Sequence, residues 1–281
     1  MMMVAAKTND SSAKLGHVVY WSGTDNDVEV KVVQAALKSA GLNEELAYDP
    51  EKKNAFIRAV RKAEEEKLVR RVEETPAKLV FQFTREFLSG QQLDYSCEAL
   101  VTFSKTTGGV YSTSKVVESL VAKHLTHTST HFLPRDITAL IQRVFHKEAD
   151  LLPLRARGSV YFVPQQYAEL VAKVQDFMGR IGWTLESLNI GKEEASKGAV
   201  YRAFIEEMKT TLADMEKTVT EVENTPDEQT ATRSVTMRVR SVKEAMTRVR
   251  NYEELLSATA DDLKTGLKNI HERLTAKLAR L

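Results

Sequence analysis

The chain opens with two stretches in which apolar residues recur every three to four positions, the spacing of one buried helix face. The first covers residues 28–40, after a short strand-like run at 17–22, and Gly41 supplies a helix stop. The second begins at Asp49 and Pro50, where the aspartate is placed to cap the helix and a proline in the first turn sacrifices no hydrogen bond. These patterns predict two helices in succession.

After the second helix the apolar period changes to two residues. Apolar and polar positions alternate over 79–84 and 93–103, which is typical of strands with one covered face, and 68–72 is a shorter strand-like run. Hairpin-like turns separate the three runs. Because two helices followed by an antiparallel meander is the order of a winged helix, we expect residues 17–111 to form one winged-helix-like unit.

Residues 112–192 repeat this order in a shorter form. Ser114 and Pro134 each open a helical pattern, and apolar runs at 151–154 and 160–163 predict a hairpin with a basic tip. A further helix and an extra strand complete the segment. The two units are not similar in sequence, so the repeat is one of pattern alone. Together they predict an α+β, mainly helical fold with two winged-helix-like units.

From residue 193 onwards the pattern is helical throughout. After a break at 224–227, an apolar heptad runs over about 228–281 without a proline, and only Glu253 and Lys277 interrupt its seam. A helix of that length extends roughly 75 Å, well beyond its shorter partner. We therefore expect residues 193–281 to form a long C-terminal coiled-coil helical hairpin whose unpaired end packs on a second copy or on a partner chain. The expected oligomerisation residues are Leu256, Leu263, Leu267, Ile270 and Leu274.

Composition favours a helical protein and excludes several classes. The 281 residues include 12 Gly, 6 Pro and 7% aromatic residues, which argues against an all-β or a disordered chain. Cys97 is the single cysteine, so an intrachain disulfide and a thiolate zinc site are excluded. No apolar run approaches the roughly 20 residues that span a bilayer. Residues 1–16 lack the apolar core of a signal peptide and are expected to be a disordered lead-in. We expect a cytoplasmic protein without membrane contact.

Signs of enzymatic chemistry are sparse. The sequence contains no phosphate-binding loop and no motif of a zinc protease or serine hydrolase. His124, His127 and His131 would share one face of a continuous helix, as a metal site needs, but hydroxyl residues surround them and Pro134 follows, so we interpret the stretch as a polar loop. Cys97 alternates inward on its strand and is expected to be a buried, inert thiol. We expect a non-enzymatic protein with no metal, cofactor or small-molecule substrate.

The charges nearly cancel, since 40 Lys and Arg face 39 Asp and Glu for a formal net charge of +1. Any affinity for nucleic acid must therefore come from local patches. Three groups of basic residues are candidates for phosphate contacts, although those of the second helix and of the coiled coil could instead be solvated helix surfaces. On the second helix, in the second unit and on the coiled coil, respectively, they are Lys52, Lys53, Arg58, Arg61 and Lys62; Arg135, Arg143, Lys147, Arg155 and Arg157; and Arg233, Arg240, Lys243 and Arg250. Glu73 and Glu74 at the tip of the first wing count against phosphate contact there.

Several sequence segments between residues 17 and 164 resemble an uncharacterised protein family that is associated with bacteriophages and other bacterial mobile elements. They are YWS, NAFIRAVRK, LVRRV, LDYSCEALVTFSKTTGGVY, LPRDITALI and RGSVYFVP. The resemblance covers about half of the chain and brings no known reaction, cofactor or catalytic residue. It implies the cytoplasm of a bacterium or of a phage-infected cell, and it favours work on nucleic acid.

Two functions stay open on this reading. The first is a non-enzymatic DNA-binding protein that assembles through its coiled coil, which the basic stripe of the coil and Arg155 with Arg157 favour. The alternative is a scaffold or adaptor whose winged helices contact protein, which the near-zero net charge and the acidic first wing favour. A hydrolase or nuclease lacks any clustered acid or metal signature.

Overall fold

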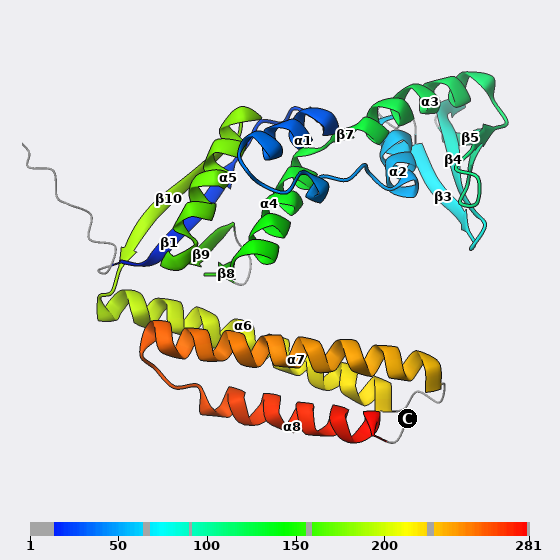
Figure 1. Ribbon diagram of the computed structural model, residues 1–281. Helices are drawn as coiled ribbons and strands as arrows, with labels where there is room; N and C mark the ends of the chain where they lie inside the picture. Colours follow the sequence, from blue (N-terminus) through cyan, green and yellow to red (C-terminus); the bar gives the residue numbers. More distant parts are fainter. Residues whose placement is uncertain (1–13, 64–67, 90–91, 156–158, 224–227, 280–281) are drawn as a thin grey trace, which may run out of the picture. The chain divides into compact units, whose positions relative to one another are not determined.

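A computed structural model of the chain describes residues 14–63, 68–89, 92–155, 159–223 and 228–279 (Figure 1). Eight α-helices and three antiparallel sheets lie in these residues, so the expected α+β class is confirmed. None of the helices within the described ranges is both long and apolar enough to cross a membrane. The expected disordered lead-in falls almost entirely outside these ranges.

The chain divides into two compact units. The outer unit contains the chain up to Ser22, then Phe145–Gln175, and then everything from Thr184 to the C-terminus. The inner unit contains Gly23–Val144 and Asp176–Trp183. The residue boundaries between the units fall within α4 (Pro134–Glu148) and close to the end of α5 (Ala168–Arg180).

The outer unit contains a four-stranded sheet in the order β10-β1-β9-β8, with all neighbours antiparallel. Its strands are β1 (Lys14–Ser22), β8 (Leu152–Pro153), β9 (Val160–Pro164) and β10 (Thr184–Gly191). The predicted hairpin β8–β9 therefore forms, but β1 adds to it from 130 or more residues away, with Val18 opposite Phe162. Trp21 of β1 stacks on Tyr161 of β9 with ring centroids 4.9 Å apart, and this contact stabilises the β1–β9 pairing near its end.

The rest of the outer unit is a bundle of α6 (Glu194–Glu223), α7 (Glu228–Leu256) and α8 (Asp261–Leu278). The prediction of one unbroken helix over 228–281 is wrong, because the helix ends at Leu256 and restarts at Asp261. Ser257 between them has a φ of 53°, and the Glu253 carboxylate accepts the Ala260 backbone N–H at 2.6 Å. Glu253, one of the two polar residues in the predicted seam, thus caps a backbone N–H at the helix break.

This break changes the interpretation of the heptad. With α8 folded back, each of the three helices packs against the other two. The seam side chains are buried in this chain's own core, at 4% exposure or less: Leu256, Leu263, Leu267, Ile270 and Leu274. The long unpaired overhang on which the expected contact with a second chain depended is therefore not present among the described residues.

The inner unit begins with β2 (Val28–Glu29) and α1 (Val30–Ser39), followed by the short 3-10 helix η2 (Glu44–Leu46) and then α2 (Lys52–Lys62). Its main sheet runs in the order β3-β4-β5-β6, with strands Leu68–Glu74, Lys78–Ser89, Gln92–Ser104 and Val110–Ser112. Helix α3 (Lys115–Thr130) follows, and β7 (His131–Phe132) pairs with β2. Helices α2 and α3 cover one face of the main sheet (Figure 1), where Phe56 and Val117 are buried against Phe83.

Two details of the inner unit depart from the predictions. The meander gains a fourth strand, β6, because Gly108 with a φ of 74° allows the chain to turn back tightly after β5. The expected cap at Asp49 is wrong, since α2 begins only at Lys52 and Glu51 occupies the N-cap position.

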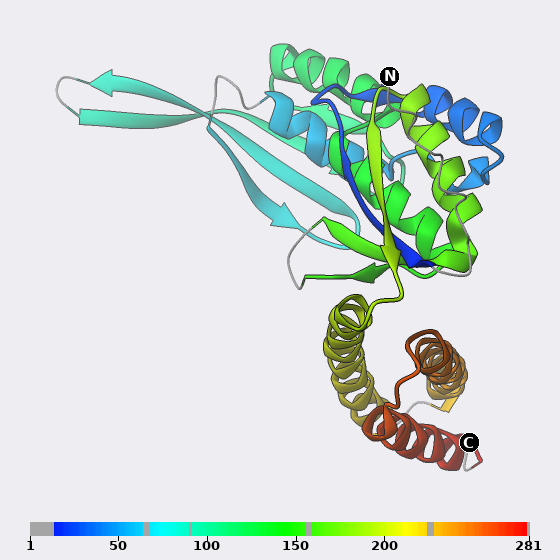
Figure 2. The same ribbon diagram turned by 90° about the vertical axis from the view of Figure 1, so that its left-hand side faces the viewer.

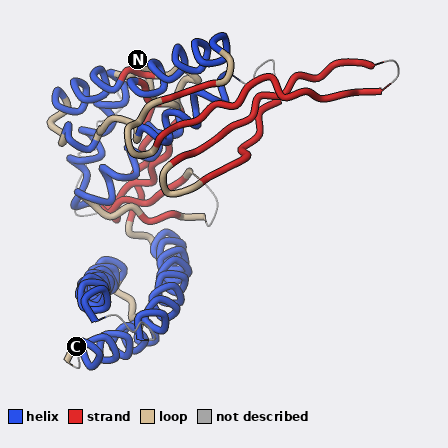
Figure 3. Tube along the Cα trace, turned by 90° about the vertical axis from the view of Figure 1, so that its right-hand side faces the viewer, coloured by secondary structure: helices blue, strands red, loops and turns tan. Residues whose placement is uncertain are grey.

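The hairpin β4–β5 continues past the end of β3, whose pairing stops at Thr84. Residues 85–89 and 92–97 therefore pair only with each other, and Figures 2 and 3 show them as a two-stranded ribbon beyond the other strands of this sheet. At the base of the ribbon Phe83 faces Ala99 whereas Thr84 faces Cys97, so Glu98 forms a β-bulge. Because the bulge interrupts the alternation of side chains, Ala99 is buried and Cys97 is exposed. The predicted burial of Cys97 is wrong.

Candidate nucleic-acid interface

Helix α2 carries five of the predicted phosphate contacts, and the inner unit neutralises three of them. Arg58 donates to both carboxylate oxygens of Asp136, at 2.6 and 2.7 Å. The Lys62 ammonium lies 2.6 Å from Asp27, and that of Lys53 lies 2.8 Å from Glu74. Lys52 and Arg61 are exposed on the same helix.

Asp136 fixes Arg58 while it also starts a helix. Its Oδ2 accepts the Leu133 backbone N–H at 2.9 Å, three residues back, as the third residue of a helix does in a capping box. The side chains of Arg58 and Asp136 are 13% and 19% exposed, so the bidentate pair is well shielded from solvent. The buried Nε of Arg58 has no hydrogen-bond partner in the described structure. The guanidinium is therefore held in one orientation at the beginning of α4.

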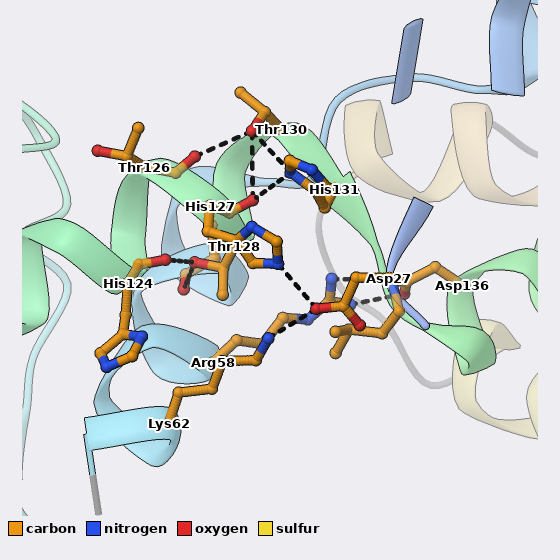
Figure 4. A network of polar contacts seen from close by, with 12 residues as sticks. Asp27, Arg58, Lys62, His124, Thr126, His127, Thr128, Thr130, His131 and Asp136 are labelled. Carbon is orange, nitrogen blue, oxygen red and sulfur yellow. Dashed lines mark hydrogen bonds and ion pairs between the residues drawn. The ribbon is translucent and has the colours of Figure 1, made fainter. Parts of the chain in front are cut away.

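A second carboxylate, Asp27, joins α2 to α3 (Figure 4). Lys62 Nζ and His127 Nε2 both lie close to its Oδ2, at 2.6 and 2.9 Å. Burial acts to raise the pKa of Asp27, but the hydrogen bonds from Lys62 and His127 outweigh it and hold this pKa below its usual value. His127 also stacks on His131, with ring centroids 3.9 Å apart. Asp27 therefore remains ionised and locates Lys62.

The expected loop around the three histidines is wrong, because α3 continues through His124 and His127 as far as Thr130. The hydroxyls of Thr126, Thr128 and Thr130 bond to carbonyl oxygens four residues earlier, so these residues are accommodated within the helix. The buried Thr128 hydroxyl also bonds to the Ala55 carbonyl oxygen on α2, at 2.8 Å. In Figure 4, His124 lies apart from His127 and His131. The described residues hold no group of three His, Cys, Asp or Glu arranged for a metal ion.

A cationic pocket of about 410 Å³ lies where α2 meets the beginning of α4. Its lining residues are Arg58, Arg61, Lys62, Leu133, Pro134 and Arg135, none of them acidic. Asp136 and Asp27 fix two of its cations, whereas Arg61 and Arg135 are exposed and have no ion pair within the described part of the chain. The N-terminus of α4 adds its own partial positive charge. This arrangement suits an anion with several oxygen atoms, such as a phosphate.

A smaller pocket of about 240 Å³ is also lined by Arg58, together with Tyr48, Asn54 and Arg143. The Arg143 guanidinium lies 4.4 Å from the centre of the Tyr48 ring, and its Nη1 donates to the Leu46 carbonyl oxygen at 2.6 Å. Arg143 was predicted as a phosphate contact, but its hydrogen bond and its stacking hold it against the η2–α2 loop. Tyr48 itself is 59% exposed.

The acidic tip of the first hairpin is internally balanced. Glu74 accepts hydrogen bonds from Lys53, Arg71 and Lys105, and Glu73 pairs with Lys78 at 2.9 Å. The repulsion of phosphate that the sequence predicted for this tip is thereby reduced, because each carboxylate already faces a cation.

The other predicted cations lie in the outer unit. Lys147 and Arg155 are exposed there, but Glu206 and Glu207 line the same pocket as Arg155. On α7, Arg240 pairs with Glu244 at 2.9 Å, while Lys243 and Arg250 are exposed. Two predicted residues cannot be placed: Arg157 lies outside the described residues, and the side chain of Arg233 is not described.

The structure thus brings together Arg58, Arg61 and Lys62 with Arg135, which the sequence assigned to separate units. Sequence reasoning missed Asp27 and Asp136 as their anchors. The spacing of Asp136 after Leu133 and Pro134 is a helix-start signal that would have placed it. Tyr48 and Asn54 were also missed, and no local pattern marks them.

Comparison with known proteins adds a family but no activity. A protein-family model matches residues 14–281, and it describes a family of unknown function. The expected resemblance to an uncharacterised family is confirmed at that level. No curated protein and no solved structure matches the chain.

Proposed function

The chain belongs to the family of unknown function DUF6744, and from its own residues we propose that it is a non-enzymatic nucleic-acid-binding protein. The observation that carries this proposal is the cationic pocket of the inner unit. Arg61 and Arg135 are exposed and unpaired there among the described residues, next to Arg58 and Lys62, which carboxylates hold in position. Because Asp136 and Asp27 neutralise Arg58 and Lys62, it is Arg61 and Arg135 that supply the local charge that a net charge of +1 does not.

Arginine suits this task because its planar guanidinium binds phosphate oxygens through paired hydrogen bonds. The Asp136 carboxylate already holds Arg58 in place, so part of the ordering cost of binding is met in the free protein. The order of α1, α2 and the β3–β4 hairpin supports the idea that α2 is a recognition helix of the winged-helix kind. The segments that resemble an uncharacterised family associated with bacteriophages and mobile elements would suit this role in a bacterial or phage-infected cytoplasm.

The five seam residues are buried inside the chain's own three-helix bundle, where they are not accessible to a second chain.

The test is salt-dependent binding of DNA to the full chain, in which the logarithm of the association constant is plotted against that of the salt concentration. Arg61→Gln with Arg135→Gln should weaken binding to every sequence and reduce the slope by about one to two. The matched control is Lys243→Gln with Arg250→Gln, which removes two exposed cations from α7. An equal loss in both double variants, or no loss in the first, would contradict the proposal.

A second candidate, an adaptor that binds protein, is favoured by the ribbon of residues 85–97. Phe87, Leu88 and Tyr95 are 46%, 74% and 55% exposed on it. A two-stranded ribbon with exposed apolar side chains is stable only marginally by itself and gains from a covering surface. A crosslinker attached to the exposed Cys97 in cells that make the protein should then capture a protein partner, and Leu88→Asp should abolish that capture. Capture that is indifferent to Leu88→Asp would count against the adaptor.

A further inference from the structure

We propose that the smaller pocket beside Arg58 takes one unpaired base, so that this protein binds single-stranded nucleic acid. The inference rests on the proposed function and names the form of the nucleic acid. Its starting point is that Arg58 lines two pockets of the inner unit, the cationic one and the one that contains Tyr48.

Tyr48 has the properties of a stacking platform. Its ring is held from one side, because the Arg143 guanidinium lies 4.4 Å from the ring centre and is itself anchored on the Leu46 carbonyl oxygen. The side chain is nevertheless 59% exposed, so ring surface is left for a second planar group. Every nucleobase has a π-face that stacks on such a ring, and the cation behind the ring strengthens the contact.

The lining of this pocket includes the polar side chains of Asn54 and Arg58. Asn54 donates one amide hydrogen to Glu51, at 2.9 Å, and among the described residues its carbonyl oxygen and second amide hydrogen have no partner, so they can bond to a base edge. The Nε of Arg58 is buried and has no partner among the described residues. The volume of about 240 Å³ is below the roughly 300–1,000 Å³ of sites that enclose a whole drug-sized ligand. It therefore suits one base whose sugar and phosphate stay outside.

The cationic pocket then holds the phosphate of the same strand. Arg61 and Arg135 are the cations of that pocket that have no ion pair among the described residues, and Arg58 lines the base pocket as well. In a duplex each base is paired and stacked, and its faces are not available to Tyr48. An unpaired strand can place a base in the Tyr48 pocket and a phosphate in the cationic pocket at once, whereas a duplex can place only a phosphate in the cationic pocket.

The experiment compares full-chain binding of a fluorescent oligothymidylate and of a duplex of equal length in the same buffer. Wild type should bind the single strand more tightly. Tyr48→Ala should weaken single-strand binding by about tenfold or more, leave the salt slope unchanged and leave duplex binding unchanged. Tyr48→Phe should bind like wild type, because stacking needs the ring and not the hydroxyl.

The matched control is Tyr111→Ala, which removes another tyrosine of the inner unit that is 60% exposed. Circular dichroism of each variant verifies that the fold is kept. If both nucleic acids bind through Arg61 and Arg135 but Tyr48→Ala changes neither, the single-strand inference is overturned and the proposed function stands. If wild type binds neither probe, both are overturned. If Tyr111→Ala and Tyr48→Ala weaken binding equally, the assignment of the base to Tyr48 is overturned.

Discussion

Arg248 of α7 donates two hydrogen bonds to the Asp150 carboxylate, from Nε at 2.7 Å and from Nη2 at 2.8 Å. The same Nη2 lies 2.8 Å from Glu207 of α6. One guanidinium thus joins two helices of the bundle to the segment that precedes β8, and both carboxylates depend on it for charge balance. The side chains of Arg248, Asp150 and Glu207 are between 18% and 26% exposed, so water compensates little for a missing partner.

Arg248→Gln should therefore lower the free energy of unfolding by about 3 kcal/mol, because it leaves two mostly buried carboxylates without a cation. Arg250→Gln is the control, since it removes an exposed cation from the same helix two residues later and should change the free energy by about 0.5 kcal/mol or less. Urea denaturation followed by circular dichroism measures both. Equal stabilities for the two variants would mean that the Arg248 cluster makes no net contribution to the free energy of unfolding.

At the break between α7 and α8, a serine-to-glycine substitution should stabilise the protein, whereas the same substitution inside α7 should destabilise it. Ser257 has a φ of 53°, a left-handed conformation that costs a residue with a β-carbon about 1 kcal/mol. Ser257→Gly should stabilise the protein by about that amount. Ser241→Gly, at an exposed position inside α7, should destabilise it by about 0.5–1 kcal/mol. Thermal unfolding of both variants decides the point. A loss of stability in Ser257→Gly would contradict the described helix break.

The heptad and its break show which features the sequence encodes locally. The apolar spacing predicted helices over most of 195–281, and these helices exist. The same spacing cannot distinguish one long helix from two helices that bury their seams on each other. Glu253 interrupts the seam where the helix turns, so the one local sign of the break was its polar character.

Long-range pairing explains the other differences. Strand β1 was recognised as a strand, but its place between β9 and β10 depends on residues more than 130 positions away, which no local pattern contains. The bulge at Glu98 exposes Cys97 although the alternation around it is regular. The basic residues of α2 were identified individually, whereas their pairing with Asp27 and Asp136 decides which of them are free.

Glu74 provides a test by pH. Hydrogen bonds from Lys53 and then Lys105 lower the pKa of Glu74 from 4.5 to about 2. Because the folded-state pKa is the lower one, the stabilisation is complete above about pH 4.5 and is lost as the pH falls towards 2. A carboxyl NMR titration should place the Glu74 midpoint near pH 2, and Lys53→Gln should raise it. Lys52→Gln, which removes a neighbouring cation with no hydrogen bond to Glu74 among the described residues, should change it little. A midpoint near 4.5 in wild type would contradict the described contacts.

Gly16 tests how closely β1 approaches its neighbour. A β-carbon at this position would collide with the Val163 carbonyl oxygen and would lie 2.7 Å from the Phe162 ring. Neither group can yield, because Val163 is part of the β1–β9 pairing and Phe162 is fully buried. Gly16→Ala should therefore lower the free energy of unfolding by about 2 kcal/mol, as overpacking of a core does.

The control for this prediction is Gly198→Ala in α6 of the same unit. Its nearest neighbour is the Arg202 guanidinium, 3.5 Å from the added carbon, which is an ordinary contact with a flexible side chain. Since glycine is a poor helix former, this substitution should stabilise the protein by about 0.5–1 kcal/mol. Urea denaturation of the two variants should therefore move the midpoint in opposite directions. A Gly16→Ala variant as stable as wild type would show that β1 does not lie against β9 in the described register, because only that register brings Val163 and Phe162 against Gly16.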